Sequence, residues 1–162
     1  MIINTARVVD RVAGVVLKED SVLLMYRKNY GKEYYTFPGG GIDYGETKEG
    51  AFIREMAEET SLNVKPEKIL YEVNWDNGTK QYFFQVTCLI GEPVLGDFDE
   101  RKIMQKDPEQ YYEPKWVQIA DLPKLLIFPL EVVDLLISDL KTGLPAIARQ
   151  LSITFATSRQ ER

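Results

Sequence analysis

The chain has 162 residues, 44% hydrophobic and 28% charged, a balance that predicts one globular domain over residues 1–162 with a sizeable core. Its net charge of −5 argues against a protein that coats nucleic acid through bulk charge, although a nucleotide can bind where a metal or local cations screen its phosphates. One cysteine and no histidine exclude an intrachain disulfide, a cysteine-based zinc site and an imidazole base, so acid–base chemistry must come from carboxylates, lysine, tyrosine or metal-bound water.

No targeting signal is visible at the start of the chain. The residues Met1–Asp10 lack the apolar run of a signal peptide, and no stretch approaches the roughly 18 apolar residues of a membrane-spanning helix. Because the single Cys88 also suits a reducing compartment, we expect a cytoplasmic protein that does not enter a membrane.

Two β-rich runs come first, Val12–Leu17 and Ser21–Tyr26, with a turn at residues 18–20 between them. Arg27 closes the second run, shortly before a glycine-rich stretch. Alone, this arginine would be a solvated strand end. A guanidinium beside a phosphate-binding loop matches phosphate geometry, however, so Arg27 is a candidate substrate contact.

The chain is organised around residues 37–62, where a glycine-dense loop leads into a helix that Thr47 can cap. At about 100° per residue, Glu55, Glu58 and Glu59 fall on one face of this helix. The opposite face, predicted to pack on the core, carries Phe52, Ile53, Met56 and Ala57.

A glutamate-rich helix face is most often plain solvated surface. Here none of the three glutamates has a lysine or arginine four residues further on, so the face is not an ordinary salt-bridged one. The preceding Gly39, Gly40 and Gly41 would let the backbone approach a ligand closely. Together these features predict a divalent metal, with Mg²⁺ suited to oxygen ligands, holding phosphate oxygens.

Two further strands are expected after the helix, Lys68–Asn74 and Lys80–Ile90, joined by a hairpin turn at Asn77-Gly78. Along the second strand, Cys88 shares a face with apolar residues and is predicted to fill the core. The other face is mixed and would border a ligand cleft or a second helix.

The segment Gly91–Glu113 is long, polar and acidic, and a connection of this length is usually functional or mobile. A strand at Tyr112–Val117 and a helix at Leu130–Lys141 follow, the helix beginning after Pro129 and ending near Gly143. Residues 151–156 are expected to form a strand or a dimer contact, and the last residues a flexible tail.

The segment from Gly40 to Leu62 resembles the Nudix box, G-x5-E-x7-R-E-U-x-E-E-x-G-U, where U is a bulky apolar residue. Glu46, Arg54 and Glu55 fall in register with it, as do Met56, Glu58 and Glu59. The resemblance implies an α/β fold, an α/β/α sandwich around a mixed β-sheet. It also implies an enzyme that hydrolyses a diphosphate linkage in a nucleoside diphosphate joined to another moiety.

The same resemblance implies roles for individual residues. Glu55, Glu58 and Glu59 would hold Mg²⁺, with Mn²⁺ as an alternative, and Arg54 would orient Glu46 or a metal-binding glutamate. The backbone of Gly39–Gly41 would shape the site, and Arg27 stands where a family arginine often contacts substrate. The general base would be Glu55 or Glu58, with a glutamate of the acidic segment as the alternative: Glu100, Glu109 or Glu113.

One position departs from the family pattern, because Ser61 stands where the box has its second glycine. That glycine lies just past a helix, where a left-handed conformation is common. We expect either strain on the order of 1 kcal/mol at Ser61 or a different helix end, through Asn63. The departure touches no carboxylate.

Two other function classes share features with this sequence. A non-catalytic nucleotide-sensing module would bind without turnover, but every carboxylate of the box is retained. Isopentenyl diphosphate isomerase chemistry on a related fold needs a catalytic cysteine, whereas Cys88 is expected on a buried face. Residues 127–131 contain no asparagine like the one that reads the base in the oxidised-guanine branch, which weakens that assignment. A homodimer is left open.

Overall fold

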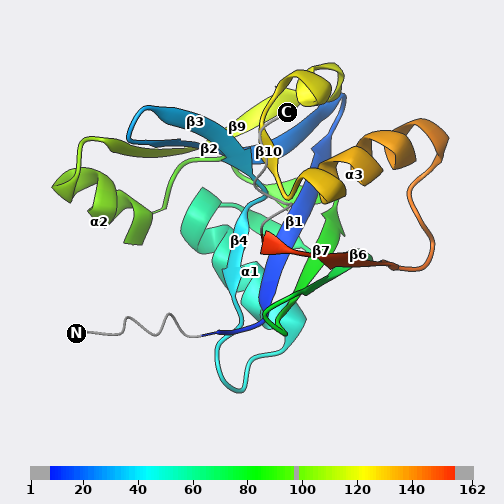
Figure 1. Ribbon diagram of the computed structural model, residues 1–162. Helices are drawn as coiled ribbons and strands as arrows, with labels where there is room; N and C mark the ends of the chain where they lie inside the picture. The colour runs from blue at the N-terminus through cyan, green and yellow to red at the C-terminus, as the bar shows by residue number, and fades with distance from the viewer. Residues whose placement is uncertain (1–7, 97–98, 156–162) are drawn as a thin grey trace.

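The computed structural model describes residues 8–96 and 99–155 (Figure 1). The strands are β1 (Arg11–Lys18), β2 (Ser21–Asn29), β3 (Lys32–Thr36), β4 (Gly39–Gly41), β5 (Asn63–Lys65), β6 (Ile69–Trp75), β7 (Lys80–Val86), β8 (Cys88–Ile90), β9 (Gln110–Gln118), β10 (Ile127–Phe128) and β11 (Arg149–Ile153). The helices are α1 (Lys48–Thr60), α2 (Asp99–Lys106) and α3 (Leu130–Thr142), with a 3₁₀ turn, η1, at Ile119–Lys124.

Within the described residues the large sheet is mixed and follows the order β10-β3-β2-β1-β7-β6-β11. The pairs β1–β7, β6–β11 and β3–β10 are parallel, and the others are antiparallel. Two further strands join it at the side, since β4 pairs with β1 and β9 pairs with β2. The short strands β5 and β8 form a separate pair.

Strand β1 changes partner along one of its edges. Its end pairs with β2, with Leu17 opposite Val22, whereas its beginning pairs with β4, with Arg11 opposite Gly41. The other edge runs parallel to β7 throughout. The sheet therefore divides where β2 and β4 separate, and this division positions the candidate site.

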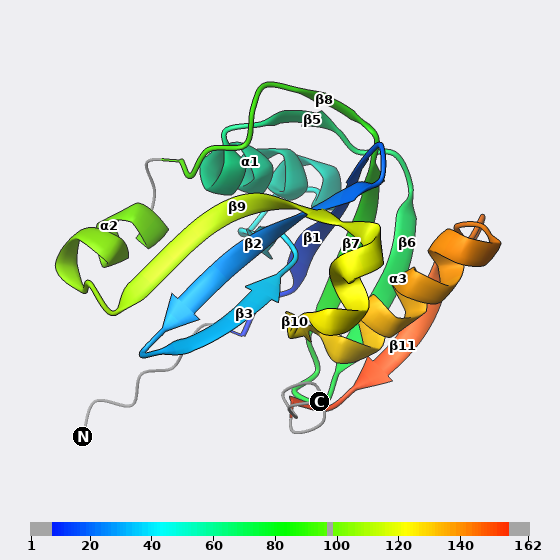
Figure 2. The ribbon, with the colours of Figure 1, turned by 90° about the horizontal axis from the view of Figure 1, so that it is seen from above.

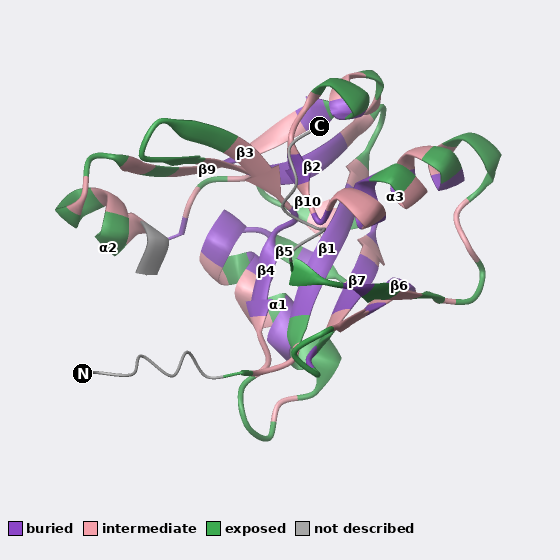
Figure 3. Cartoon of the chain, viewed as in Figure 1, coloured by how far each residue is buried: buried purple, intermediate pink, exposed green. Residues whose placement is uncertain are grey.

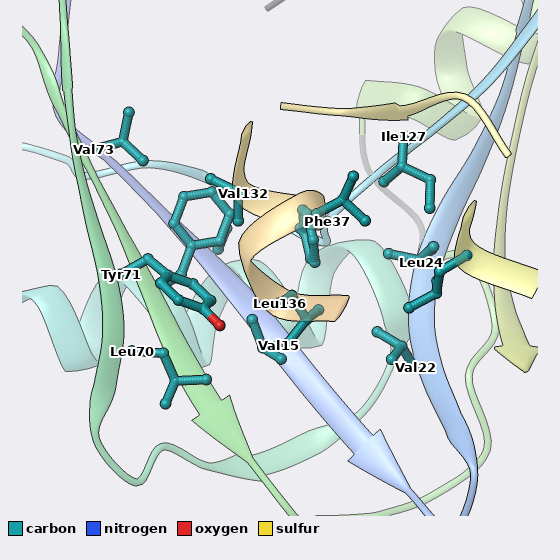
Figure 4. Close-up of a cluster of buried hydrophobic side chains, with 14 of the residues drawn as sticks. Val15, Val22, Leu24, Phe37, Leu70, Tyr71, Val73, Ile127, Val132 and Leu136 are labelled. Atoms are coloured by element: carbon teal, nitrogen blue, oxygen red, sulfur yellow. The ribbon is translucent and has the colours of Figure 1, made fainter. Parts of the chain in front are cut away.

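Strand β1 is buried along most of its length (Figure 3), and its alternating side chains belong to two cores, one on each face of the sheet. Ala13 and Val15 join the core under α3, and Figure 4 shows Val15 there with Tyr71 and Leu136. On the opposite face, a second core under α1 contains Val12, Val16, Leu23, Phe52, Met56 and Phe84. Helices thus cover both faces of a mixed sheet (Figure 2), which confirms the predicted α/β/α sandwich.

The predicted strand Lys80–Ile90 is interrupted. Strand β7 ends at Val86, and the backbone N–H of Thr87 donates to the Glu67 carboxylate at 2.8 Å. The chain then turns into β8, which pairs with β5 instead of continuing the large sheet. Cys88 is consequently exposed, and its predicted place in the core is wrong.

Helix α2 forms within the acidic segment 91–113, where no helix was predicted. Of the two alternatives predicted for residues 151–156, the structure shows the strand, because β11 extends the sheet beside β6. The hairpin, the strand β9 and the helix α3 between Pro129 and Gly143 appear as predicted. The predicted flexible tail at 156–162 lies outside the described residues. Among the helices that are described, none combines the length and apolarity needed to cross a membrane.

Candidate active site

The glycine stretch is a strand, not a loop, and it contacts α1 at Glu55 and Glu59. Thr47 caps the helix by accepting a hydrogen bond from the Gly50 N–H at 3.0 Å. Gly39 and Gly40 pack too closely against their neighbours to carry a side chain. A Cβ at Gly39 would overlap the Val12 carbonyl, and one at Gly40 would overlap the Glu55 carboxylate. Glycine at position 40 thus makes the space that this carboxylate occupies.

Arg54 lies at the centre of the acidic residues of α1. Its Nε and Nη2 hold the two oxygens of Glu46 at 2.7 and 2.9 Å, and Nη2 also donates to the Gly41 carbonyl at 2.9 Å. Its Nη1 donates to Glu55 at 2.9 Å and to Glu58 at 3.2 Å. The expected ion pair between Arg54 and Glu46 is present. The acidic face also contains its own cation, because Arg54 precedes Glu55 and Glu58 in the sequence and contacts both.

The carboxylates around Arg54 differ in pKa because their surroundings differ. The two-pronged bond from Arg54 and the Asp43 N–H lower the pKa of Glu46 to about 2. Burial raises the pKa of Glu55, since desolvation outweighs the stabilising effect of Arg54, and the Glu55 side chain is only 14% exposed. The charged form of Glu55 is therefore stabilised less by its surroundings than the charged form of Glu46 is.

Glu59 is placed differently from the other two glutamates. The buried face of α1 consists of Ala51, Phe52, Met56, Glu59 and Thr60. Residues Ile53 and Ala57, predicted to pack on the core, are exposed instead. The helix is rotated relative to the predicted orientation, and this turns Glu59 inward.

The buried Glu59 carboxylate joins the two halves of the divided sheet. It accepts from the Gly39 N–H of β4 at 2.9 Å and lies 3.7 Å from the guanidinium of Arg27 on β2. Arg27 also donates from Nε to the Thr36 hydroxyl at 3.0 Å and stacks on the Tyr112 ring at 4.9 Å. The predicted substrate arginine is thus fixed beside the acidic helix.

The Glu55 and Glu58 carboxylates suit a divalent cation whose remaining coordination positions are filled by other ligands. Glu55 and Glu58 both reach one nitrogen of Arg54, so their oxygens converge on a single cationic position. Among the described residues no three acidic groups gather closely enough to hold a metal alone. Mg²⁺ typically uses one or two carboxylates with waters and substrate phosphates, so the arrangement fits this ion.

The helix ends at Ser61 by adopting the conformation of the missing glycine. Ser61 has φ 59°, in the left-handed region, and its N–H bonds to the Ala57 carbonyl at 3.0 Å. Its hydroxyl donates to the Val94 carbonyl at 2.9 Å. The alternative exit through Asn63 is wrong, and the serine ties α1 to the segment before α2.

The structure shows contacts on the β2–β9 side of the molecule for two of the three candidate glutamates of the acidic segment, Glu109 and Glu113. The Glu109 carbonyl bonds to the Tyr30 N–H at the tip of the β2–β3 hairpin. Glu113 lies on β9 opposite Tyr26, where its carboxylate meets Lys115 and Tyr111. The side chain of Glu100 lies outside the described residues.

A cleft of about 880 Å³ opens on the α3 side of the sheet where β2 and β4 separate. Its inner part includes Gly39, Arg11 and Arg27, so it adjoins the Glu59 contacts described above. Aromatic and amide side chains also line it: Tyr34, Phe37, Trp75, Asn77, Gln81, Phe128 and Phe155. Gln81 lies on the mixed strand face that was predicted to border a ligand cleft. Sequence reasoning missed the aromatic residues, although Trp75 directly before the hairpin turn was an available signal.

A family model described as NUDIX domain matches residues 8–136. The chain therefore belongs to the Nudix hydrolase family, whose box it carries from Gly40 to Leu62. Among curated relatives, an RNA pyrophosphohydrolase of Vibrio vulnificus is 32% identical over 124 residues, covering 64% of this chain and 67% of that protein. One from Yersinia pestis is 40% identical over 100 residues, covering 51% and 57%.

Solved structures agree with this assignment. A MutT structure from a study of Aliivibrio salmonicida and Vibrio cholerae has a TM-score of 0.64 and 26% identity, covering 81% of this chain and 98% of that one. A Nudix hydrolase from Nitrosomonas europaea has a TM-score of 0.68 at 20% identity, covering 89% and 77%, which shows the fold alone. The fold and the matched family define a pyrophosphohydrolase enzyme.

Proposed function

We propose that this protein is a Mg²⁺-dependent hydrolase that cleaves a diphosphate linkage in a nucleoside diphosphate joined to another group. The observation that supports it most directly is the contact between two parts of the site. The acidic helix meets the cleft at Glu59, which holds Gly39 and Arg27 from the two cleft walls. A substrate in the cleft would thus present its phosphates to Glu55 and Glu58.

Glu55 and Glu58 would hold the metal, with Glu59 beside them and Mn²⁺ as an alternative ion. A bound divalent ion supplies charge that neutralises phosphate oxygens and acidifies water. Arg27 and Arg11 line the inner cleft and would bind the remaining phosphate charge. Glu55 or Glu58 would take the proton from the attacking water.

Arg54 and Glu46 would act by positioning. The two hydrogen bonds between them fix the guanidinium, and its remaining N–H groups fix Glu55 and Glu58. Orientation of this kind keeps metal ligands in place before the metal binds. Gly40 contributes by leaving room for the Glu55 carboxylate.

The substrate is proposed from a narrow set. The relatives are named RNA pyrophosphohydrolases, and the structural neighbours include an ADP-ribose pyrophosphatase from Streptococcus suis. Both names describe hydrolysis of a diphosphate linkage in a substrate that contains a nucleotide. We place this chemistry in the cytoplasm, where such nucleotides are abundant.

The test is a substrate panel with purified protein and Mg²⁺: nucleoside triphosphates, nucleotide sugars, ADP-ribose, dinucleoside polyphosphates and RNA with a 5′-triphosphate. We expect turnover of at least one, lost in Glu58→Gln and on chelation. Glu49→Gln, at an exposed position in the first turn of the same helix, is the matched control and should remain active. Unchanged turnover in Glu58→Gln would overturn the assigned site.

A further inference from the structure

The C-terminal part of the chain extends the sheet beyond the region that the family model matches. The match ends at residue 136, within α3, whereas β11 follows at Arg149–Ile153. In Figure 2, β11 lies beside β6 at the edge of the sheet, and the two strands pair in parallel, with Leu151 opposite Val73. This strand therefore adds a wall that the matched region does not include.

Specific contacts hold the added strand in place. Arg149 donates to the buried carboxylate of Asp139 at 2.8 Å, and the Tyr71 hydroxyl donates to the same carboxylate at 2.9 Å. At the other end, the Asp76 N–H bonds to the Ile153 carbonyl at 3.1 Å. The strand is thus anchored to both α3 and the β6–β7 hairpin.

This anchoring brings an aromatic ring into the cleft. The Phe155 N–H donates to the Asp76 carboxylate at 3.3 Å, and the Phe155 ring stacks on Trp75 with centroids 4.5 Å apart and planes 18° apart. Both rings line the cleft. The Trp75 Nε1–H donates to the amide oxygen of Gln81, another cleft-lining residue, at 3.3 Å. This bond fixes the amide so that its N–H₂ group faces away from the Trp75 Nε1–H.

The separation between the aromatic pair and the phosphate-binding end of the cleft matches the length of a nucleotide. Counting from Gly39 on β4, the sheet runs through β1 with Arg11 and β7 with Gln81 to β6 with Trp75. Strands in a sheet are about 4.8 Å apart, so the three steps amount to about 14 Å across the sheet. Gly39 pairs with Ala13, whereas Gln81 pairs with Val73. Gly39 and Trp75 are therefore also offset along the strand direction, which adds to their separation. An extended nucleotide with two or three phosphates covers a distance of this order.

We propose that Trp75 and Phe155 form the nucleobase site of this enzyme, with Gln81 donating a hydrogen bond to an acceptor at the base edge. The proposal rests on the proposed function, which places the phosphates at the Arg11 and Arg27 end. Aromatic rings stack with any base, because every base presents a flat π face, whereas a fixed amide donor favours bases with an acceptor in reach. Phe155, the member of this site that lies beyond the family match, would then contribute to how tightly the nucleoside binds.

The first experiment measures binding without metal or hydrolysis. The chain has two tryptophans, so Trp116→Phe leaves Trp75 as the sole tryptophan reporter. Titration with the four nucleoside monophosphates should quench Trp75 fluorescence, to different extents for different bases. In this background Phe155→Ala should weaken binding roughly 5-fold or more, because a base stacks on the outer face of the Trp75–Phe155 pair and the substitution removes one ring of that pair. Phe155→Tyr should restore it.

The control is Ile147→Ala in the same C-terminal segment, since Ile147 is 85% exposed and does not line the cleft. It should bind like the parent. A circular dichroism melt of each variant separates loss of binding from loss of folding. If Phe155→Ala keeps the parent affinity, or if Ile147→Ala weakens binding equally, the proposal is overturned.

The second experiment separates this proposal from the proposed function. With the best substrate of the panel, Phe155→Ala should raise KM by the same factor while kcat stays within about threefold, because the ring binds substrate far from the reacting phosphates. Turnover by the parent with no effect of Phe155→Ala on KM would refute the base site and leave the hydrolase assignment intact. Absence of turnover together with base-dependent quenching would overturn the hydrolase assignment and support the base site.

Discussion

Arg54 is expected to stabilise the acidic helix when no metal is bound, and Arg54→Ala tests this directly. The substitution leaves Glu55, whose side chain is 14% exposed, without its nearest cation. Breaking a fully buried ion pair costs about 3–5 kcal/mol. Because the Arg54 side chain is 29% exposed, solvent screening reduces the expected loss to about 2–3 kcal/mol. For a chain of this size, that lowers Tm by roughly 4–12 °C.

The assay is urea unfolding followed by circular dichroism, first with a chelator and then with Mg²⁺. If the metal binds between Glu55 and Glu58, it neutralises the same carboxylates that Arg54 contacts. The cost of Arg54→Ala should therefore be clearly smaller with Mg²⁺ than with chelator. Arg54→Lys keeps the charge but loses the paired hydrogen bonds to Glu46, so it should fall between parent and alanine variant.

Arg149→Ala is the matched control, because it also removes an arginine from a carboxylate but lies far along the chain, at α3 and β11. It should lose stability by an amount that Mg²⁺ does not change. An equal cost of Arg54→Ala with and without Mg²⁺ would refute the reasoning, since the cation would then not share these carboxylates. A loss well below 1 kcal/mol in chelator would show that Arg54 contributes no more than an exposed ion pair.

Three further predictions concern neighbouring residues. The pKa of Glu46 is lowered to about 2, so its contribution to stability is present above its ordinary pKa and is lost as pH falls toward 2. Urea midpoints measured across this acid range should fall less steeply with pH in Glu46→Gln than in the parent. Ser61→Gly should be nearly neutral in thermal melts, because relief of left-handed strain offsets the lost bond to Val94, whereas Ser61→Ala keeps the strain and should lose about 1 kcal/mol. Gly40→Ala should reduce kcat at least about tenfold, since its Cβ would displace the Glu55 carboxylate from its place beside α1.

Each of these has an outcome that contradicts it. If the urea midpoints of the parent and of Glu46→Gln fall equally steeply as the pH is lowered, the contact with Arg54 does not lower the pKa of Glu46. A Ser61→Ala variant as stable as Ser61→Gly would show that the left-handed conformation costs nothing here. Gly45→Ala, at φ 82° with open space around it, is the control for Gly40, and equal loss of kcat in both would point to backbone strain rather than displacement.

The sequence predicted the sandwich, the cap at Thr47 and the pairing of Arg54 with Glu46, because each depends on local spacing or on the box motif. It did not predict the rotation of α1 that buries Glu59. A helical projection places side chains relative to one another, whereas the core decides which side faces inward. Glu59 is accommodated there because Gly39 and Arg27 satisfy its carboxylate.

The cleft could not be derived from the sequence for a related reason. Trp75 lies on β6, Gln81 on β7 and Phe155 two residues after the end of β11, and only the pairing of β11 with β6 brings Phe155 to the other two. The error at Cys88 has the opposite origin, in an alternating pattern that continues past the end of β7. The turn at Thr87, held by a hydrogen bond to Glu67, interrupts the strand at a point where no glycine or proline in the sequence predicts a turn.

The arrangement of β1 has a consequence for how the chain folds as it is synthesised. Strand β2 follows β1 at once, but the parallel partner β7 lies far along the chain, with Arg11 opposite Gln81. Until that segment leaves the ribosome, the β7-facing edge of β1 has unpaired backbone groups and apolar side chains on both faces. Contacts between such distant segments also slow folding. A nascent chain that pauses before residue 80 is therefore the form of this protein most prone to aggregate.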